Sequence, residues 1–379
     1  MNVWHVITRL ILGGAQENTL LTCEGLHARG HRVTLVTGPA LGREGELLHR
    51  AHAGGYEVIV LDDMRREINP LRDWRTLRTL RKLMRSARPD VMHSHSSKAG
   101  VLARQAAWDV DIPAVHTIHG LPFHPYQSAW ANRLYIALER RYARRSAAII
   151  SVADTMTRKA LAAEVGTPAQ YTTIHSGLEV DLFRNRPPRA DEFRAGLNLP
   201  TGAVLVSQVS RIAPLKGHEY IIAAARRVPE NVHFCFVGDG PARDEIASAV
   251  RSAGLEGRVH MTGLLPQHDM PAVMHASDIV VHCSLREGLA RAIPQAMLAG
   301  KAVVSFDIDG AREVVNHSTG VLLEPGDVDG LTEAIAKLAA DEESRNHMGQ
   351  AGRHMCTEMF DHKLMVDRIE KLYRDILER

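Results

Sequence analysis

The chain alternates short apolar runs with stretches of helical length, and it does so in two successive series. In the first half the runs of strand length are rich in apolar residues at successive positions, not only at every second residue. Such runs indicate strands that are buried on both faces, as in parallel sheets covered by helices. Strands spaced by helices predict a doubly wound α/β domain. The predicted strands of this half are residues 2–9, 32–37, 56–61, 90–94, 113–118, 147–152 and 171–175.

The alternation restarts after a segment rich in proline and arginine, residues 183–202, which we interpret as a linker. A length of 379 residues is ample for two domains. We therefore predict an N-terminal Rossmann-like domain over residues 1–190 and a second over 191–379. The final helix, near 363–378, is a candidate to pack back on the first domain. The predicted strands of the second half are residues 203–209, 232–237, 259–262, 278–283, 301–306 and 319–323.

The cysteines and the N-terminus bear on the cellular compartment. The four cysteines match no CxxC spacing, and most lie in apolar runs, which favours buried, reduced thiols and the cytoplasm. The first residues, MNVWHVITRLILGGAQE, lack a charged leader and a cleavage site. No apolar run approaches the 18 residues typical of a membrane span. We expect a cytoplasmic protein.

Charge is unevenly distributed along the chain. Residues 1–195 hold 27 Lys and Arg against 19 Asp and Glu, whereas residues 196–379 hold 19 against 25. A basic first half suits an anionic partner, such as membrane lipid, a phosphate-bearing substrate or nucleic acid. Residues 71–89 predict a basic amphipathic helix, which either packs on the core or lies on the inner face of an anionic membrane. Nucleic acid is disfavoured because few aromatic residues accompany the arginines.

The stretch SLREGLARAIPQ, residues 284–295, places an acid beside a glycine at the end of a predicted strand. Pro294 fits only the first turn of a helix, so the helix begins shortly before it. The backbone N–H groups of residues 288–290 can then hold an anion. Glu287 suits sugar hydroxyl groups better than phosphate, which it would repel. The alternative is a solvated loop acid.

Two cations lie on the loop that follows the first strand of the second half. Arg211 and Lys216 stand in SRIAPLKG, residues 210–217, directly before a predicted helix. Together they suit a diphosphate, with charge-assisted hydrogen bonds of roughly 1.5–3 kcal/mol each. A surface loop with incidental charges is the alternative.

Glycines follow two other strands. Gly13 and Gly14, in LGGAQE, allow close backbone approach to a ligand at a helix start. Neither this stretch nor VGDGP, residues 237–241, completes the GxGxxG pattern. Nicotinamide dinucleotide binding is therefore disfavoured.

Histidines and aspartates at strand ends raise the question of a metal. His93, His95 and His119 end neighbouring predicted strands, but no thiolate or carboxylate completes a set at metal-like spacing. The DxD of FDIDG, residues 306–310, also ends a parallel strand. We expect no metal, and we expect His119 to meet a polar ligand.

These motifs together resemble a known family along essentially the whole chain. The stretches LGGAQ, DVMHSHSSKAG, HTIHGLPFH, SRIAPLKG, FVGDGP, EGLARAIPQAMLAGKAVV and STGVLLEPGD follow one another in the order found in retaining glycosyltransferases of family 4. The HSSKAG and HGLPFH segments are most similar to enzymes of capsular polysaccharide, exopolysaccharide and glycolipid biosynthesis. The resemblance implies the GT-B fold, in which two Rossmann-like domains face each other across a cleft.

The resemblance also implies roles for individual residues. Arg211 and Lys216 would bind the donor diphosphate, Glu287 the transferred sugar, and His119 the sugar near the reacting centre. Gln295 replaces the second glutamate of the family's E-x7-E pair, whose partner is the ribose, and an amide can still hydrogen bond there. The remaining donor contacts implied by the resemblance are Gly14, Gly288, Leu289 and Ala290.

The implied activity is transfer of a hexose from a nucleoside-diphosphate sugar to a lipid-linked or saccharide acceptor, with retention of configuration. UDP is the preferred nucleotide, followed by GDP, and no metal is required if protein cations neutralise the phosphates. Two alternatives remain: a nucleotide-sugar epimerase of the same fold, and a non-catalytic protein that binds sugar or lipid.

Overall fold

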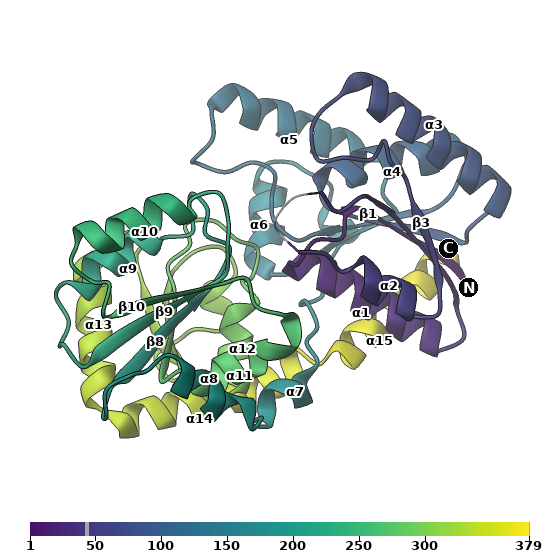
Figure 1. Ribbon diagram of the computed structural model, residues 1–379. Helices are drawn as coiled ribbons and strands as arrows, with labels where there is room; N and C mark the ends of the chain where they lie inside the picture. The colour runs from purple at the N-terminus through teal and green to yellow at the C-terminus, as the bar shows by residue number, and fades with distance from the viewer. Residues whose placement is uncertain (42–44, 379) are drawn as a thin grey trace. The chain divides into compact units, whose positions relative to one another are not determined.

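The computed structural model describes residues 1–41 and 45–378 and divides into two compact units (Figure 1). The first unit comprises Met1–Gly177 with His362–Arg379, and the second comprises Leu178–Asp361. Each unit is built on one parallel sheet, so the prediction of two doubly wound domains is confirmed. The domain boundary lies at residues 177/178, not at the predicted 190/191.

The first sheet has seven strands in the order β3-β2-β1-β4-β5-β6-β7. The order reverses between β1 and β4, which defines the topological switch point of a doubly wound sheet. The predicted strands agree with the observed ones to within about two residues. These strands are β1 (Asn2–Arg9), β2 (Arg32–Gly38), β3 (Glu57–Val60), β4 (Val91–His95), β5 (Ala114–Ile118), β6 (Ala148–Ser151) and β7 (Tyr171–Thr173).

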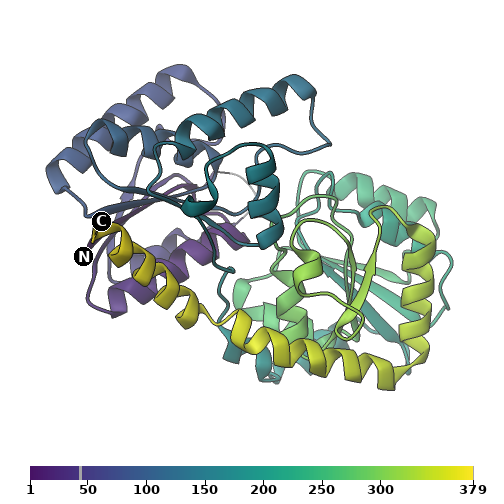
Figure 2. The same cartoon turned by 180° about the vertical axis from the view of Figure 1, so that it is seen from behind.

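Helices cover both faces of this sheet. Alternate residues of β1 divide between them: Val3 and Ile7 pack towards α1 (Gly14–Ala28), whereas Trp4 and Val6 pack towards α3 (Pro70–Ala87). The last helix, α15 (His362–Leu377), lies beside α1 within the same unit (Figure 2). The other helices of this unit are α2 (Leu48–Ala53), α4 (Ser97–Asp109), α5 (Ala129–Ala143) and α6 (Asp154–Ala162).

The second sheet has six strands in the order β10-β9-β8-β11-β12-β13, so its switch point lies between β8 and β11. Its strands are β8 (Val204–Val209), β9 (Val232–Val237), β10 (Val259–Gly263), β11 (Ile279–His282), β12 (Ala302–Phe306) and β13 (Gly320–Leu323). Its helices are α7 (Val180–Arg184), α8 (Arg189–Gly196), α9 (His218–Ala225), α10 (Arg243–Ser252), α11 (Met270–Ala276), α12 (Ala292–Leu298), α13 (Val328–Ala340) and α14 (Glu342–Met359).

The segment predicted as a linker, residues 183–202, is part of the second unit. Phe193, Leu197 and Leu199 pack against an apolar cluster that includes Leu205 and Val273. From the sequence, this segment is interpreted as a linker because it is rich in turn-forming residues. Such residues also occur at the ends of short helices and in connections within a domain, so they do not identify a domain boundary.

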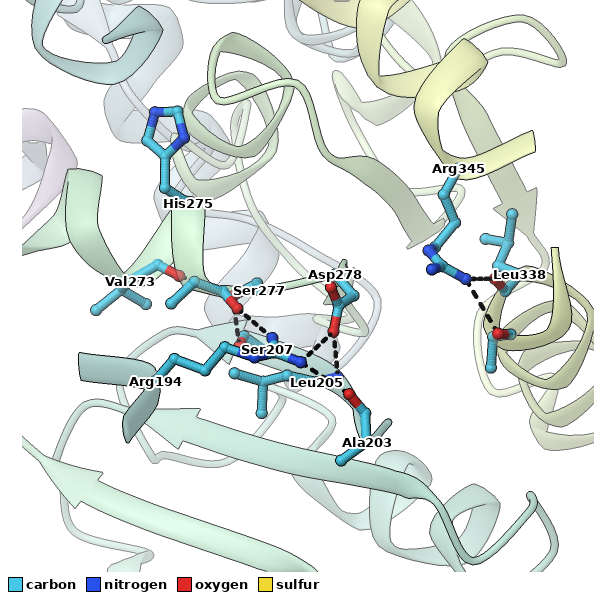
Figure 3. Close-up of polar contacts among 12 residues, drawn as sticks. Arg194, Ala203, Leu205, Ser207, Val273, His275, Ser277, Asp278, Leu338 and Arg345 are labelled. Atoms are coloured by element: carbon cyan, nitrogen blue, oxygen red, sulfur yellow. Dashed lines mark hydrogen bonds and ion pairs between the residues drawn. The ribbon is translucent and has the colours of Figure 1, made fainter. Parts of the chain in front are cut away.

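A polar network anchors this segment at the amino ends of β8 and β11 (Figure 3). The Arg194 guanidinium lies 3.0 Å from the Asp278 carboxylate and donates to the carbonyl oxygens of Ala203 and Ala276. Asp278 also accepts the backbone N–H of Leu205, at 2.7 Å. The network therefore ties α8 to the edge of the sheet opposite the strand carboxyl ends.

A buried ion pair gives a stability prediction for the first unit. Arg104 on α4 donates to Glu139 on α5 at 2.8 Å, and their side chains are 0% and 6% exposed. We expect Arg104→Ala to lower the free energy of unfolding by roughly 3–5 kcal/mol, because it leaves an uncompensated buried carboxylate. Urea denaturation measures this. As a control, Arg227→Ala breaks an exposed pair with Asp329 and should change little. Equal effects of the two variants would contradict the prediction.

The cysteine prediction is confirmed, since Cys23, Cys235, Cys283 and Cys356 are all free and buried. Within residues 1–41 and 45–378, no helix combines the length and the apolarity needed to cross a bilayer.

Candidate functional site

In the second unit, the predicted ligand residues lie on the two loops that flank the switch point. The loop after β8 carries Arg211 and Lys216, and the loop after β11 carries Glu287. A backbone hydrogen bond joins the loops: the N–H of Leu285 donates to the carbonyl oxygen of Leu215 at 2.9 Å. Ligands of open α/β sheets bind at this place, beyond the carboxyl ends of the strands.

Gly217 explains how closely these two loops approach each other. Its φ of +74° lies in the left-handed region, and a Cβ there would meet the Cys283 carbonyl oxygen at 1.9 Å. Only glycine fits both requirements. The glycine of SRIAPLKG therefore sets the position of Lys216 against the β11 loop.

Lys216 and Glu287 form an ion pair across the loops, although they are 71 positions apart in the chain. His282, the last residue of β11, places Nε2 3.6 Å from the same carboxylate oxygen. Burial alone raises the pKa of Glu287, but attraction by Lys216 and hydrogen bonding to His282 outweigh it and hold the pKa well below its usual range. Glu287 is therefore an ionised hydrogen-bond acceptor at neutral pH.

The loop after β11 also presents unused backbone donors. Within the described part of the chain, the N–H groups of Gly288, Leu289 and Ala290 donate to no other group. Pro294 lies at the third position of α12, so the helix begins where the sequence predicts. Buried polar groups normally have partners, so a row of free donors beside a lysine suits an anionic or hydroxyl-bearing ligand.

The GxG of VGDGP has a structural explanation. Gly238 and Gly240 have positive φ, and a Cβ on them would meet the carbonyl oxygens of Ser210 and Ile212 at 2.1 and 2.3 Å. These glycines let the loop after β9 lie directly against the SRIAPLKG loop. They shape the site without forming a dinucleotide fingerprint.

The aspartates of FDIDG are engaged by protein groups. Asp309 accepts the backbone N–H of Glu287 at 3.0 Å, and Asp307 pairs with Arg312. Asp309 therefore fixes the backbone at Glu287, a role that the DxD pattern did not suggest.

His282 is a site residue that the sequence analysis missed. Its signal was a histidine directly after the apolar residues 279–281 of the run DIVVHC. Among the described residues, its buried Nδ1 and the neighbouring Ser284 Oγ have no hydrogen-bond partner. Gln295, which the family resemblance assigns to the nucleoside, lies on α12, and its side chain is buried.

In the first unit, Gly14 begins α1 directly after β1, and His119 follows β5. His119 lines a small cavity of about 40 Å³ together with Ser96, Ser97 and Phe123. Gly14 therefore follows a strand at the switch point, whereas His119 follows β5, one strand further along the sheet. They belong to a different unit from Lys216 and Glu287.

Histidines cluster behind His119. His5, His93 and His95 are fully buried and offer ring nitrogens within 4.8 Å of one another, a spacing open to a metal ion. His93, however, already bonds Tyr373 Oη at 2.5 Å and Thr117 Oγ1 at 2.7 Å. His5 was not considered in the sequence analysis, since nothing local connects β1 with β4.

The predicted basic helix, α3, packs Leu80 and Met84 in the core but exposes Leu71 and Trp74. A second surface of the same kind was not predicted. An open groove of about 900 Å³ runs along α5, where Leu134 and Trp108 are surrounded by arginines. Helices α3 and α5 cover the same side of the first sheet (Figure 1).

Two family models match this chain. Residues 13–177 match the "Glycosyl transferase 4-like domain", and residues 189–355 match "Glycosyl transferases group 1". The 2-deoxystreptamine N-acetyl-D-glucosaminyltransferase of Streptomyces fradiae is 31% identical over 88% of this chain and 84% of its own length. The UDP-Gal:alpha-D-GlcNAc-diphosphoundecaprenol alpha-1,3-galactosyltransferase of Escherichia coli is 28% identical over 100% of this chain and 97% of its own.

Solved structures share the fold. HepE of Anabaena in complex with UDP-glucose superposes with a TM-score of 0.84 at 22% identity, covering 99% of this chain and 100% of HepE. Sucrose-phosphate synthase of Thermosynechococcus elongatus superposes with a TM-score of 0.85 at 21% identity, covering 100% of both chains.

Proposed function

Because the chain belongs to the group 1 glycosyltransferase family and has the GT-B fold, we propose that it transfers a hexose from UDP-sugar to a lipid-linked or saccharide acceptor. Polysaccharide or glycolipid biosynthesis is the setting that we propose. The proposal rests on the pairing of Lys216 with Glu287 at the switch point of the second sheet. Beside this pair lie the N–H groups of residues 288–290, which have no acceptor among the residues that the structure describes.

The second unit is the proposed donor-binding unit. Lys216 and Arg211 would face the diphosphate, whose negative charge grows as it leaves. Glu287, ionised and held by Asp309 through its backbone, would accept hydrogen bonds from sugar hydroxyls. Gln295 would hydrogen bond the ribose through its amide. The first unit, with Gly14 and His119, would receive the acceptor and contact the transferred sugar.

We propose front-face displacement with retention. The acceptor oxygen forms a bond to the anomeric carbon as the bond from that carbon to the diphosphate oxygen breaks. The acceptor proton passes to the departing phosphate oxygen, so UDP leaves as the second product. Protein cations and backbone donors would supply the charge stabilisation, and the proposed reaction requires no metal.

The comparisons give no support to the epimerase alternative. Product analysis distinguishes a glycosyltransferase from both alternatives. An epimerase converts its donor without an acceptor, and a non-catalytic binding protein forms no product. UDP as carrier draws support from the Escherichia coli relative, whose name specifies UDP-Gal.

A thermal-shift screen of UDP, GDP and their sugars tests the function. A donor present at 100 times its Kd stabilises the folded protein by about 2.7 kcal/mol. We expect UDP-sugars to raise the melting temperature most, and the sugar that does so to be transferred to a saccharide or polyprenyl-diphosphate acceptor. If no nucleoside diphosphate shifts the melting temperature, the proposed function is wrong.

We also propose that the α3 and α5 side of the first unit contacts anionic lipid at the inner face of the membrane. Exposed Trp74 and Trp130 can enter the interface between headgroups and acyl chains, while neighbouring arginines face lipid phosphates. Arg78 lies over the Trp74 ring, with Cζ 5.7 Å from the ring centroid.

Vesicle sedimentation tests the lipid contact. We expect the wild type to bind vesicles containing phosphatidylglycerol and not neutral phosphatidylcholine vesicles. The double variant Trp74→Ala/Trp130→Ala should bind the anionic vesicles about tenfold more weakly, because two interfacial aromatics are lost. Leu264→Ala removes an exposed apolar side chain from the second unit and serves as the control. Equal binding to both kinds of vesicle would refute the contact.

A further inference from the structure

A chain of buried histidines leads from the core of the first unit to His119. His95 Nδ1 lies 3.1 Å from His119 Nε2, and His5 Nδ1 lies 3.0 Å from His95 Nε2. His5 and His95 are fully buried. We propose that His95 and His5 are positioning residues that hold His119 in one tautomer, with its hydrogen on Nδ1. The catalytic meaning of this inference rests on the proposed function.

Hydrogen bonding along the chain is constrained because a neutral imidazole has one N–H and one acceptor nitrogen. Burial lowers the pKa of His5 to about 3 and that of His95 well below its usual range, so both rings are neutral at pH 7. In each histidine–histidine contact one nitrogen must donate and the other must accept. His95 can donate in only one direction, so its tautomer fixes the direction of both bonds.

Two arrangements satisfy both contacts. In one, His5 donates to His95, which donates to His119. In the other, His119 donates to His95, which donates to His5. Within the described residues, His5 Nε2 is buried without a partner, so the second arrangement would leave an unpaired N–H there. The first leaves only an unused lone pair, and orphaned buried N–H groups are rarer in proteins than under-used acceptors.

Donation from His5 through His95 determines the tautomer of His119. His119 accepts through Nε2 and must carry its hydrogen on Nδ1, so it offers a hydrogen-bond donor. A donor held in one tautomer suits a sugar or phosphate oxygen. His93 stands apart from this chain because Tyr373 and Thr117 engage its two ring nitrogens.

Long-range ¹H–¹⁵N correlation spectra of histidine-labelled protein report which ring nitrogen carries the hydrogen. We expect the Nδ1–H tautomer for His5, His95 and His119 in the free wild type, unchanged by EDTA. A hydrogen on Nε2 of His119 would overturn the inference. A spectrum that EDTA alters would do the same, because it would mean that a metal replaces these bonds. The measurement needs no nucleotide, so it decides the inference independently of the thermal-shift screen.

A matched pair of variants separates positioning from packing. In His95→Asn, the side-chain amide lies near the position of the lost imidazole Nδ1, so it can still donate to His119. In His95→Gln, the amide lies near the position of the lost Nε2, so it reaches only towards His5. We expect His95→Gln to give mixed His119 tautomers and to lower kcat by about 10- to 100-fold, with KM within about twofold of wild type. His95→Asn should keep both the tautomer and kcat within about threefold.

The variants His5→Asn and His5→Gln repeat the comparison at the next histidine of the hydrogen-bonded chain. The test therefore still applies if one of the His95 variants does not fold. His5→Asn can still donate to His95 and should behave as wild type, and His5→Gln should shift the His119 tautomer. A single His119 tautomer in both folded glutamine variants would refute a positioning role.

Discussion

Replacing Lys216 by alanine should lower kcat/KM for sugar transfer by about 100- to 1,000-fold while the protein stays folded, because one preorganised donor to a developing anion has an effect of this size. The substitution also leaves Glu287 without its cation. Burial, which raises the pKa of that carboxyl, is then opposed by His282 alone, so the pKa of Glu287 should rise. Steady-state kinetics with the donor found in the screen measure the loss.

Two further variants control this experiment. Lys216→Arg keeps the charge and should recover part of the rate. Arg227→Ala removes an exposed cation of the same unit that pairs with Asp329, and it should leave transfer unchanged. Turnover by Lys216→Ala at the wild-type rate would refute the assignment of this lysine to the diphosphate.

Replacing Glu287 by glutamine should lower kcat/KM by roughly 10- to 100-fold, which corresponds to the 1.5–3 kcal/mol of a hydrogen bond to a charged group. The amide keeps the size of the side chain but loses the charge that binds sugar hydroxyls most strongly. If Glu287 binds the sugar, affinity for the UDP-sugar should fall while affinity for UDP itself changes little. Calorimetry with both ligands measures the difference.

Glu333→Gln neutralises an exposed acid on α13 and is the matched control. Equal losses of affinity for UDP and for UDP-sugar in Glu287→Gln would place the carboxylate at the nucleotide and contradict its assignment to the sugar.

The fold could be predicted almost entirely from local pattern. Strands buried on both faces are predominantly apolar, so runs such as AVLVSQV and DIVVHC were visible without any knowledge of their neighbours. The site residues were visible for a related reason. Gly217 and Gly288 lie in the loops that follow strands, where parallel sheets bind ligands, and charged residues stand beside them.

The domain boundary could not be predicted in this way. Turn-forming residues in 183–202 are equally compatible with a linker and with short helices, and only the packing of Phe193 against the second core decides between them. Likewise, the amphipathic pattern of α15 shows that the helix has an apolar face. It does not show that this face packs on α1.

Sequence alone therefore determined the class of fold, the edge of each sheet where we propose that a ligand binds and the kinds of residue there, since these follow from short-range periodicity. Tertiary structure alone decided which of those residues meet. The crossover connections of the sheets bring Lys216 to Glu287 and His5 to His95, and contacts between residues 71 and 90 positions apart leave no trace in local composition.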